Sequence, residues 1–303
     1  IDDVDRACKA ARDAFESGIW SRMENNERAK IMLKAADIMQ RRWDELCRME
    51  AMDTGKPIFE VQTGDMPYSI YAFRYFANLA REIKGEYIHV ANEPYIHDYL
   101  VYEPYGVVSI IAPYNFPLHL LTRSMAPALA AGNTVVCKAS SMTPLTTAVL
   151  GEIVLEAGFP PGVVNIVSGN GSTVGAAMAS HKEVDVVALT GSEYVGRQLL
   201  ELSARSEIIK KNVLELGGKG PVIVEPDCRY ADTVVGVADG LLLNGGQVCC
   251  AQTRLILHES IYDQFLQDLA KELESRKPGD ILDPETRMGS MINRAQLDKV
   301  DMT

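Results

Sequence analysis

The stretch GVVSIIAPYNFPLHLLTRSMAPALAAGNTVVCK, residues 106–138, decides the fold. It starts with a short run of Val and Ile that is typical of a buried strand. It continues through a segment that reads as a helix and ends in a second apolar run, NTVVCK. A strand, a crossover helix and a second buried strand form the unit from which parallel sheets are built. The stretch therefore predicts a parallel sheet with helices on its faces.

The same alternation continues to residue 275. We expect further strands at 163–169, 183–192, 212–218, 220–225 and 254–258, and helices at 117–131, 144–158, 172–181, 193–204, 231–246 and 260–275. Residues 1–82 instead read as helices, with one apolar series at helical spacing from Ile31 to Leu46 and another segment from about Phe59 to Ala80. Residues 86–104 are rich in Tyr, Ile and Val with turn residues inside, which predicts a protruding β-hairpin.

Composition limits the classes of partner. The 303 residues are enough for two domains or one large one, and the formal net charge is −11. A chain this acidic is not expected to bind nucleic acid or an anionic membrane surface. No apolar run approaches the length of a membrane span, and no signal peptide is visible, although the start reads as the middle of a helix. The six cysteines form no C-x-x-C and the five histidines are dispersed, so we expect no metal site and a reducing cytoplasm.

Ligands of parallel sheets bind where strands end, so the segments after strands are the candidate site. Three of them carry functional residue types: PYNFP (113–117), TGSEYVG (190–196) and LELGGKGP (214–221). GGQVCCAQTR (245–254), with its two adjacent cysteines, lies between a predicted helix and a predicted strand. Singly, an Asn can be a turn residue, a Ser a helix cap and a Glu an edge-strand residue. Standard signatures are absent: GSEYVGRQ lacks the end of a Walker A loop, and GNGSTVG has one residue too many for a dinucleotide fingerprint.

Taken together and in order, SIIAPYNFPLHLLTRSMAPALAAGNTVVCKASSMTP, VVALTGSEYVG, LELGGKGP and GGQVCCAQTR resemble the aldehyde dehydrogenase superfamily. The resemblance runs from the first helices to Thr303, and Cys249 follows Glu215 by 34 residues, as in the family pattern. It implies an α/β fold: a variant Rossmann-type parallel sheet in a cofactor-binding domain (1–85 and 103–217), a β-arm for oligomerisation (86–102) and an incomplete α/β catalytic domain (218–303). Family members continue beyond the point that matches Thr303.

The resemblance implies three catalytic roles. Cys249, which follows Gly-Gln-Val, matches the nucleophile that forms a thiohemiacetal and then a thioester, with Cys250 turned away. Asn115 matches the side chain that donates to the oxyanion, beside the backbone N–H of Cys249. Glu215 matches the base that activates water; if it is desolvated in its apolar strand, its pKa should be raised. The presence of this glutamate favours a free carboxylic acid over a coenzyme A ester as product.

The resemblance also implies NAD or NADP as cofactor and a small-molecule aldehyde as substrate. The expected cofactor contacts are Ile111, Ala112, Pro113, Tyr114, Asn115, Lys138, Ser140, Ser141, Gly171, Gly175, Thr190, Gly191, Ser192, Val195, Gly196, Glu215, Leu216, Gly217 and Cys249. Gly191 and Ser192, at a helix N-terminus, suit the pyrophosphate. The family's Lys-Pro-Ser-Glu reads Lys-Ala-Ser-Ser here, so Ser141 removes a repulsion of the 2′-phosphate, Lys138 could bind it, and NADP is permitted. Tyr114 replaces the family's Trp, which alters the substrate tunnel.

Two readings of the whole chain stay open. The first is an active enzyme, a homodimer or homotetramer assembled through the arm. The second is a catalytically inactive structural or binding member of the same fold, or a fragment without activity. Retention of Cys249, Glu215, Asn115 and Lys138 in one chain favours the enzyme. Betaine aldehyde, succinic semialdehyde, and aromatic and medium aliphatic aldehydes all stay open as substrates.

Overall fold

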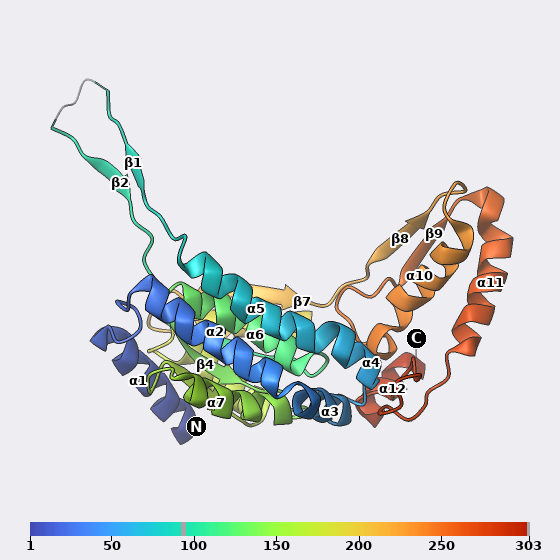
Figure 1. The fold of residues 1–303 in the computed structure, drawn as a ribbon, viewed down its shortest axis with the longest axis horizontal. Coiled ribbons are helices and arrows are strands. Elements are labelled where there is room, and N and C mark those ends of the chain that lie inside the picture. The colour runs from blue at the N-terminus through green and yellow to red at the C-terminus, as the bar shows by residue number, and fades with distance from the viewer. Residues whose placement is uncertain (92–94, 302–303) are drawn as a thin grey trace.

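The computed structural model describes residues 1–91 and 95–301 (Figure 1). The strands are β1 (Glu86–Ile88), β2 (Asp98–Leu100), β3 (Val107–Ile111), β4 (Thr134–Lys138), β5 (Val164–Val167), β6 (Val186–Gly191), β7 (Lys211–Leu216), β8 (Pro221–Val224) and β9 (Arg254–Leu257). The α-helices are α1 (Asp2–Ser17), α2 (Asn25–Arg41), α3 (Trp43–Thr54), α4 (Ile58–Glu60), α5 (Met66–Ala80), α6 (Pro117–Ala130), α7 (Leu145–Ala157), α8 (Ala176–Ser180), α9 (Glu193–Ala204), α10 (Tyr230–Leu242), α11 (Tyr262–Ser275) and α12 (Arg294–Asp301). Short π-helices η1 (Val61–Asp65) and η2 (Gly171–Gly175) and 3₁₀ turns η3 (Leu243–Gly246) and η4 (Glu259–Ile261) complete them.

The predicted parallel sheet is confirmed. Its five strands lie in the order β5-β4-β3-β6-β7, and all neighbouring pairs are parallel. Every residue of β3 and β4 is buried, as the apolar runs predicted for strands covered on both faces. The chain adds strands on one side of β3 and then returns to the other side with β6. This reversal beside β3 is the topological position at which open α/β sheets hold ligands.

Helices cover both faces of this sheet, and the alternation of side chains along each strand decides which core each residue joins. Val108 and Ile110 of β3 join one hydrophobic cluster with residues of α2, α5, α6 and α7. Val107 and Ile111 of the same strand join the other cluster, with residues of α1, α8 and α9. Each Å² of apolar surface that is buried contributes about 25 cal/mol of stabilisation. This burial on both faces of the sheet is the main force that holds the layers together.

The helices predicted from the sequence differ from the observed ones in two places. The apolar series from Ile31 to Leu46 predicts one helical segment, but α2 ends at Arg41 and α3 begins at Trp43. Arg42 leaves helical geometry at φ −92° and ψ 20°, and its guanidinium forms two hydrogen bonds with Glu45. A bend at one residue keeps both helices on the same apolar face, which is why the spacing alone concealed it. Helix α12 was not predicted from the sequence.

The later strands form a second sheet instead of extending the first. β8 and β9 pair in parallel, and α10 and α11 pack on them around Val224, Val237 and Phe265. Figure 1 shows this unit beyond the end of β7, joined to it by the glycine-rich segment after Leu216. The opposite face of the small sheet leaves Ile223 and Ile256 exposed. The chain therefore passes between the two sheets at LELGGKGP.

The predicted hairpin is confirmed. β1 and β2 are antiparallel, with Tyr87 opposite Tyr99. Both strands are fully exposed, and Figure 1 shows the hairpin projecting away from the rest of the molecule. Residues 92–94, which the predicted arm at 86–102 includes, lie outside the described residues, as do residues 302–303 of the predicted catalytic domain.

Of the helices that the structure describes, none combines the length and the apolar character needed to cross a membrane. Within residues 1–91 and 95–301, no group of three His, Cys, Asp or Glu side chains is placed to hold a metal ion. All six cysteines are free thiols.

Candidate active site

The ends of four strands meet at one edge of the five-stranded sheet. Ile111 at the end of β3 pairs with Lys138 of β4, and Thr190 of β6 pairs with Glu215 of β7. Gly175 lies against the same edge: a Cβ added to it would stand 3.6 Å from Cδ1 of Ile111 and 3.9 Å from Cδ of Lys138. The structure therefore brings together the segments that were predicted to bind the cofactor.

The predicted cofactor contacts differ in their exposure. The exposed ones are Ser141, Gly171, Ser192, Val195, Glu215, Gly217 and Cys249. The half-buried ones are Pro113, Tyr114, Asn115, Thr190, Gly191 and Leu216, and the buried ones are Ile111, Ala112, Lys138, Ser140 and Gly175, with Gly196. The exposed residues come from five different segments, so any ligand along this edge would contact several elements at once.

Helix α9 is held close to β7 by a glycine. A Cβ on Gly196 would lie 2.9 Å from Cδ2 of Leu216, so a larger residue there would require the Leu216 side chain to shift. Ser192 caps the helix, because its hydroxyl accepts the N–H of Val195 at 3.3 Å. The cap reading of this serine is thus correct. It does not prevent the first turn of the helix, which is exposed, from facing an anion.

Lys138 is more deeply buried than its predicted role requires. Its side chain is 3% exposed, and Nζ donates to the carbonyl of Ala139 at 2.7 Å. Burial lowers the pKa of this ammonium group. Ser141, three residues later, is exposed. Lys138 would therefore have to turn outward before it could contact a phosphate beside Ser141.

The segment that carries the two adjacent cysteines begins with a left-handed turn. Asn244, Gly245 and Gly246 have φ angles of 50°, 60° and 79°. Within residues 1–91 and 95–301, Asn244 is the only non-glycine residue with a positive φ. Its carbonyl accepts both the backbone N–H and the side-chain Nε2 of Gln247, at 3.1 and 3.0 Å. The turn reverses the chain after α10 and directs Gln247–Cys250 toward the sheet edge.

Asn115 lies against this segment, as its predicted role requires. Its Nδ2 donates to the carbonyl of Gln247 at 2.8 Å, and its own carbonyl accepts Nδ2 of Asn244 at 3.0 Å. Its buried Oδ1 has no hydrogen-bond partner among the described residues. From the other side, a Cβ on Gly218 would stand 3.1 Å from the carbonyl oxygen of Cys249. Segments far apart in the sequence thus converge around Cys249.

Both cysteines are exposed, and the expectation that Cys250 turns away from the site stays a prediction. Partial burial raises the pKa of the Cys249 thiol, and the neighbouring Cys250 thiol raises it further. Two adjacent thiols in one exposed turn lie too close to be independent. Because the thiolate is the nucleophilic form, Cys249 rests here as a thiol that has to lose its proton before it attacks.

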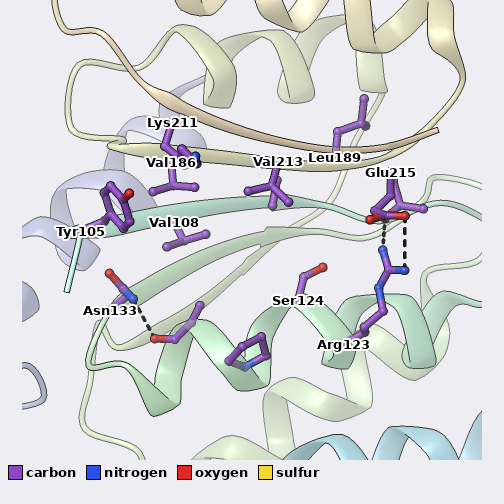
Figure 2. Close-up of a pocket in the computed structure, with 14 residues that line it drawn as sticks. Tyr105, Val108, Arg123, Ser124, Asn133, Val186, Leu189, Lys211, Val213 and Glu215 are labelled. Atoms are coloured by element: carbon purple, nitrogen blue, oxygen red, sulfur yellow. Dashed lines mark hydrogen bonds and ion pairs between the residues drawn. The ribbon is translucent and has the colours of Figure 1, made fainter. Parts of the chain in front are cut away.

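Glu215 does not have the desolvated environment that the sequence suggested. β7 is an edge strand, and its alternate residues Lys211, Val213 and Glu215 face a groove of about 410 Å³ (Figure 2). The Glu215 side chain is 56% exposed and forms an ion pair with Nη1 of Arg123 at 3.7 Å. Nη2 of Arg123 donates to Oγ1 of Thr190 at 3.2 Å. The burial that was expected of this carboxylate is therefore absent.

Sequence reasoning did not identify the residues that support the cysteine segment. Oε2 of Glu60 accepts the N–H of Asn244 at 2.9 Å, and Gln247 is fixed by Asn244 and by the N–H of Ile292 at 3.1 Å. Asn-Gly-Gly at 244–246 was a usable signal, since these residues readily adopt positive φ. Nothing local in the sequence around Glu60 indicates a contact with a residue 184 positions later.

His119 gives a pH-dependent prediction. Its ring stacks on Tyr68 with 5.3 Å between centroids, and burial, with the cations Arg123 and Lys56, lowers its pKa to about 4. Between pH 6.5 and 4 the unfolded chain therefore binds a proton that the folded chain does not. As pH falls through this window, we expect wild type to lose up to about 3 kcal/mol of unfolding free energy more than His119→Gln does. Urea unfolding of both proteins at several pH values checks this, and parallel curves would contradict it.

Comparison with known proteins agrees with this geometry. The model of the "Aldehyde dehydrogenase family" matches residues 1–303. The relatives include "Aldehyde dehydrogenase family 2 member B4, mitochondrial" of Arabidopsis thaliana, 42% identical over 299 residues, with 99% of this chain and 55% of that protein covered. They also include "Retinaldehyde dehydrogenase 3" of Homo sapiens, 40% identical over 299 residues, with 98% and 58% covered.

A solved structure shares the whole described fold. The NAD+ complex of an aldehyde dehydrogenase from Bacillus cereus superposes with a TM-score of 0.95 at 38% identity. The match covers 99% of this chain and 60% of the Bacillus cereus chain, so the sequence spans less than two thirds of the length of these relatives. Because the family match extends over all 303 residues and the fold agrees, the chain belongs to the aldehyde dehydrogenase family.

Proposed function

We propose that the protein oxidises a small-molecule aldehyde to the carboxylic acid, with NAD or NADP as the hydride acceptor. The observation that carries this proposal is the hydrogen bond from Nδ2 of Asn115 to the carbonyl of Gln247, at 2.8 Å. It places an amide donor beside the segment of an exposed cysteine, Cys249, at the ligand-binding edge of a parallel sheet. Membership of the aldehyde dehydrogenase family supports it.

The residues of the chain divide the chemistry between them. The Cys249 thiolate attacks the aldehyde carbon, and the carbonyl oxygen becomes an oxyanion. Asn115 has two N–H groups on Nδ2, of which Gln247 uses one, so the second can donate to that oxyanion. A nicotinamide cofactor bound at this edge would supply the acceptor for the hydride that leaves the thiohemiacetal carbon. The acyl group then remains on Cys249 as a thioester.

Glu215 would complete the cycle as the base. It takes a proton from the water that attacks the thioester, which releases the carboxylic acid and the Cys249 sulfur. In this structure the carboxylate faces Arg123 (Figure 2). To act as the base, Glu215 would have to leave this ion pair and rotate toward Cys249 once an acyl group is bound there.

The sheet edge fits a dinucleotide. The N-terminus of α9 at Ser192 is exposed, so its free N–H groups can face a pyrophosphate. No atom lies within 4 Å of the positions that a Cβ would take on Gly171 or Gly217, which leaves room for a ligand against the backbone there. Lys138, Ser140 and Ser141 would hold the adenosine end, and Leu216 and Gly217 would lie beside the nicotinamide.

The cofactor preference can be tested together with the activity. The purified protein is mixed with NAD or NADP and a panel of aldehydes, and reduced nicotinamide is followed by absorbance. In Ser141→Glu we expect kcat/KM with NADP to fall at least about tenfold relative to NAD, because the new carboxylate repels the 2′-phosphate. No reduction with any aldehyde, with the cofactor still bound, would support the inactive reading of the fold instead. No binding of either cofactor would contradict the proposal.

We further propose that residues 1–85 and 103–217 bind the cofactor, that 218–303 contribute to the catalytic domain, and that the arm at 86–102 joins subunits into a homodimer or homotetramer. The change from one sheet to another between Leu216 and Pro221 supports the division. Exposed aromatic side chains such as Tyr87 and Tyr99, on strands with open edges, support the arm's role. The six free thiols support a reducing compartment, the cytoplasm.

A further inference from the structure

A buried carboxyl group supports the turn that precedes the cysteines. Glu60 is 9% exposed, at the end of α4, and its Oε2 accepts the backbone N–H of Asn244 at 2.9 Å. Asn244 is itself only 3% exposed. A backbone N–H this deeply buried has no water to replace a lost acceptor, so the conformation of the turn depends strongly on this one contact.

The turn needs such support because of its backbone geometry. A non-glycine residue in the left-handed region persists when its surroundings fix it, and Asn244 is followed by two further residues with positive φ. Asn244 is held at three points. Glu60 accepts from its N–H, the carbonyl of Asn115 accepts from its Nδ2, and its own carbonyl accepts from Gln247.

These contacts connect Glu60 to the proposed oxyanion donor. Asn244 bonds to the carbonyl of Asn115, and Nδ2 of Asn115 bonds to the carbonyl of Gln247, two residues before Cys249. A shift of Asn244 would therefore move the backbone of Asn115 and the acceptor that orients its amide. The side chain of Glu60 lies at the far end of this series and is not among the residues that would touch the aldehyde.

The charges around Glu60 make its contact sensitive to pH. The groups that act on its carboxyl are the backbone N–H of Asn244 and the side chains of Lys56, Asp65 and Asp239. Lys56 is already paired with Asp65, with Nζ 2.6 Å from Oδ1. Burial raises the pKa of Glu60 to about 7. Above that pH the carboxylate accepts a charge-assisted hydrogen bond, and below it the neutral acid accepts a weaker one.

We propose that Glu60 is a positioning residue for the nucleophile: its carboxylate fixes the turn at Asn244 and thereby holds Cys249 and Asn115 in position relative to each other. The consequence for catalysis rests on the function proposed above. The structural part, that Glu60 orders residues 244–249, does not depend on it. The two can therefore be tested separately on the same set of variants.

Hydrogen exchange measures the order of this segment directly. In Glu60→Ala at pH 8 we expect amide exchange in residues 244–249 to rise at least about tenfold, because Asn244 loses its acceptor. Glu50→Gln is the matched control. Glu50 is fully buried and bonds to Leu118 and Thr146, and burial raises its pKa to about 7 as well. It does not contact the turn, so exchange in 244–249 should stay within about twofold of wild type.

The pH profile separates positioning from general loosening. After correction for intrinsic exchange, wild-type protection of 244–249 should fall as pH drops from 8 to 6. Glu60→Gln keeps an acceptor oxygen but cannot ionise, so its protection should not change over this range. Parallel profiles for these two proteins would overturn the proposal, even if Glu60→Ala does not fold. Equal loosening of 244–249 by Glu50→Gln would also overturn it.

Activity gives the third measurement. In Glu60→Ala we expect kcat for the aldehyde to fall about tenfold and the KM for the cofactor to change much less, since Asn115, the proposed cofactor residue that bonds to Asn244, does so through its backbone carbonyl. Unchanged kcat with increased exchange would overturn the catalytic part alone. If no variant and no wild type oxidises any aldehyde while the exchange results hold, the proposed function fails and the role of Glu60 in ordering the segment stands.

Discussion

Cys249→Ala should lose aldehyde oxidation by roughly 10⁴-fold or more, while it still binds the cofactor. The reason is that an alanine cannot form the thiohemiacetal, and the mechanism offers no other route to a hydride-donating adduct. Cys249 is exposed, so its replacement should leave the fold intact. The measurement is kcat/KM from the rate of nicotinamide reduction, with cofactor affinity from titration as the control for folding.

Cys250→Ala is the matched control, because it removes the other thiol of the same exposed pair. We expect it to keep activity within about threefold. Since the Cys250 thiol raises the pKa of Cys249, its removal should make alkylation of Cys249 by iodoacetamide faster at a fixed pH. If Cys250→Ala were inactive and Cys249→Ala active, the assignment of the nucleophile would be reversed.

The sequence predicted the strands well where burial leaves a simple pattern. Val107–Ile111 and Thr134–Lys138 are covered on both faces, so each reads as a continuous apolar run. It did not reveal that β8 and β9 form a second sheet, since alternating strands and helices give the same pattern for one parallel sheet or two. Which strand pairs with which is decided by packing between distant segments, and no window of the sequence contains that information.

The candidate site, too, was predicted only in part. The convergence of Asn115 with the Cys249 segment agrees with the family resemblance, which supplied it. The exposure of Glu215 was missed because it depends on β7 being an edge strand, a property of the whole sheet. The contact between Glu60 and Asn244 joins residues 184 positions apart through a buried hydrogen bond. Such a bond leaves no periodic pattern in either segment.

Lys56→Met should cause the largest loss of stability, about 3–5 kcal/mol. The Lys56 side chain is fully buried, its Nζ lies 2.6 Å from Oδ1 of Asp65, and the other Asp65 oxygen has no hydrogen-bond partner among the described residues. Burial raises the pKa of two further carboxyls, Glu50 and Glu60, and the charge of Lys56 offsets part of that rise. Without this cation, three buried carboxyl groups lose their compensating charge. Urea unfolding at pH 8 measures the loss, and at pH 5 it should be smaller, because protonation removes the uncompensated charges.

Two control variants show whether burial causes the effect. The Lys30–Glu27 pair also has an N–O distance of 2.6 Å, but its side chains are 64% and 59% exposed. Lys30→Met should therefore cost no more than about 1 kcal/mol, because water screens the partner that is left behind. Adding Asp65→Leu to Lys56→Met should recover part of the loss, since it removes one of the uncompensated carboxylates. If the double variant were no more stable than Lys56→Met, unpaired charge would not be the cause of the loss. The loss would then come from the packing contacts of the lysine side chain, whose ammonium group lies 3.7 Å from the Phe116 ring centroid.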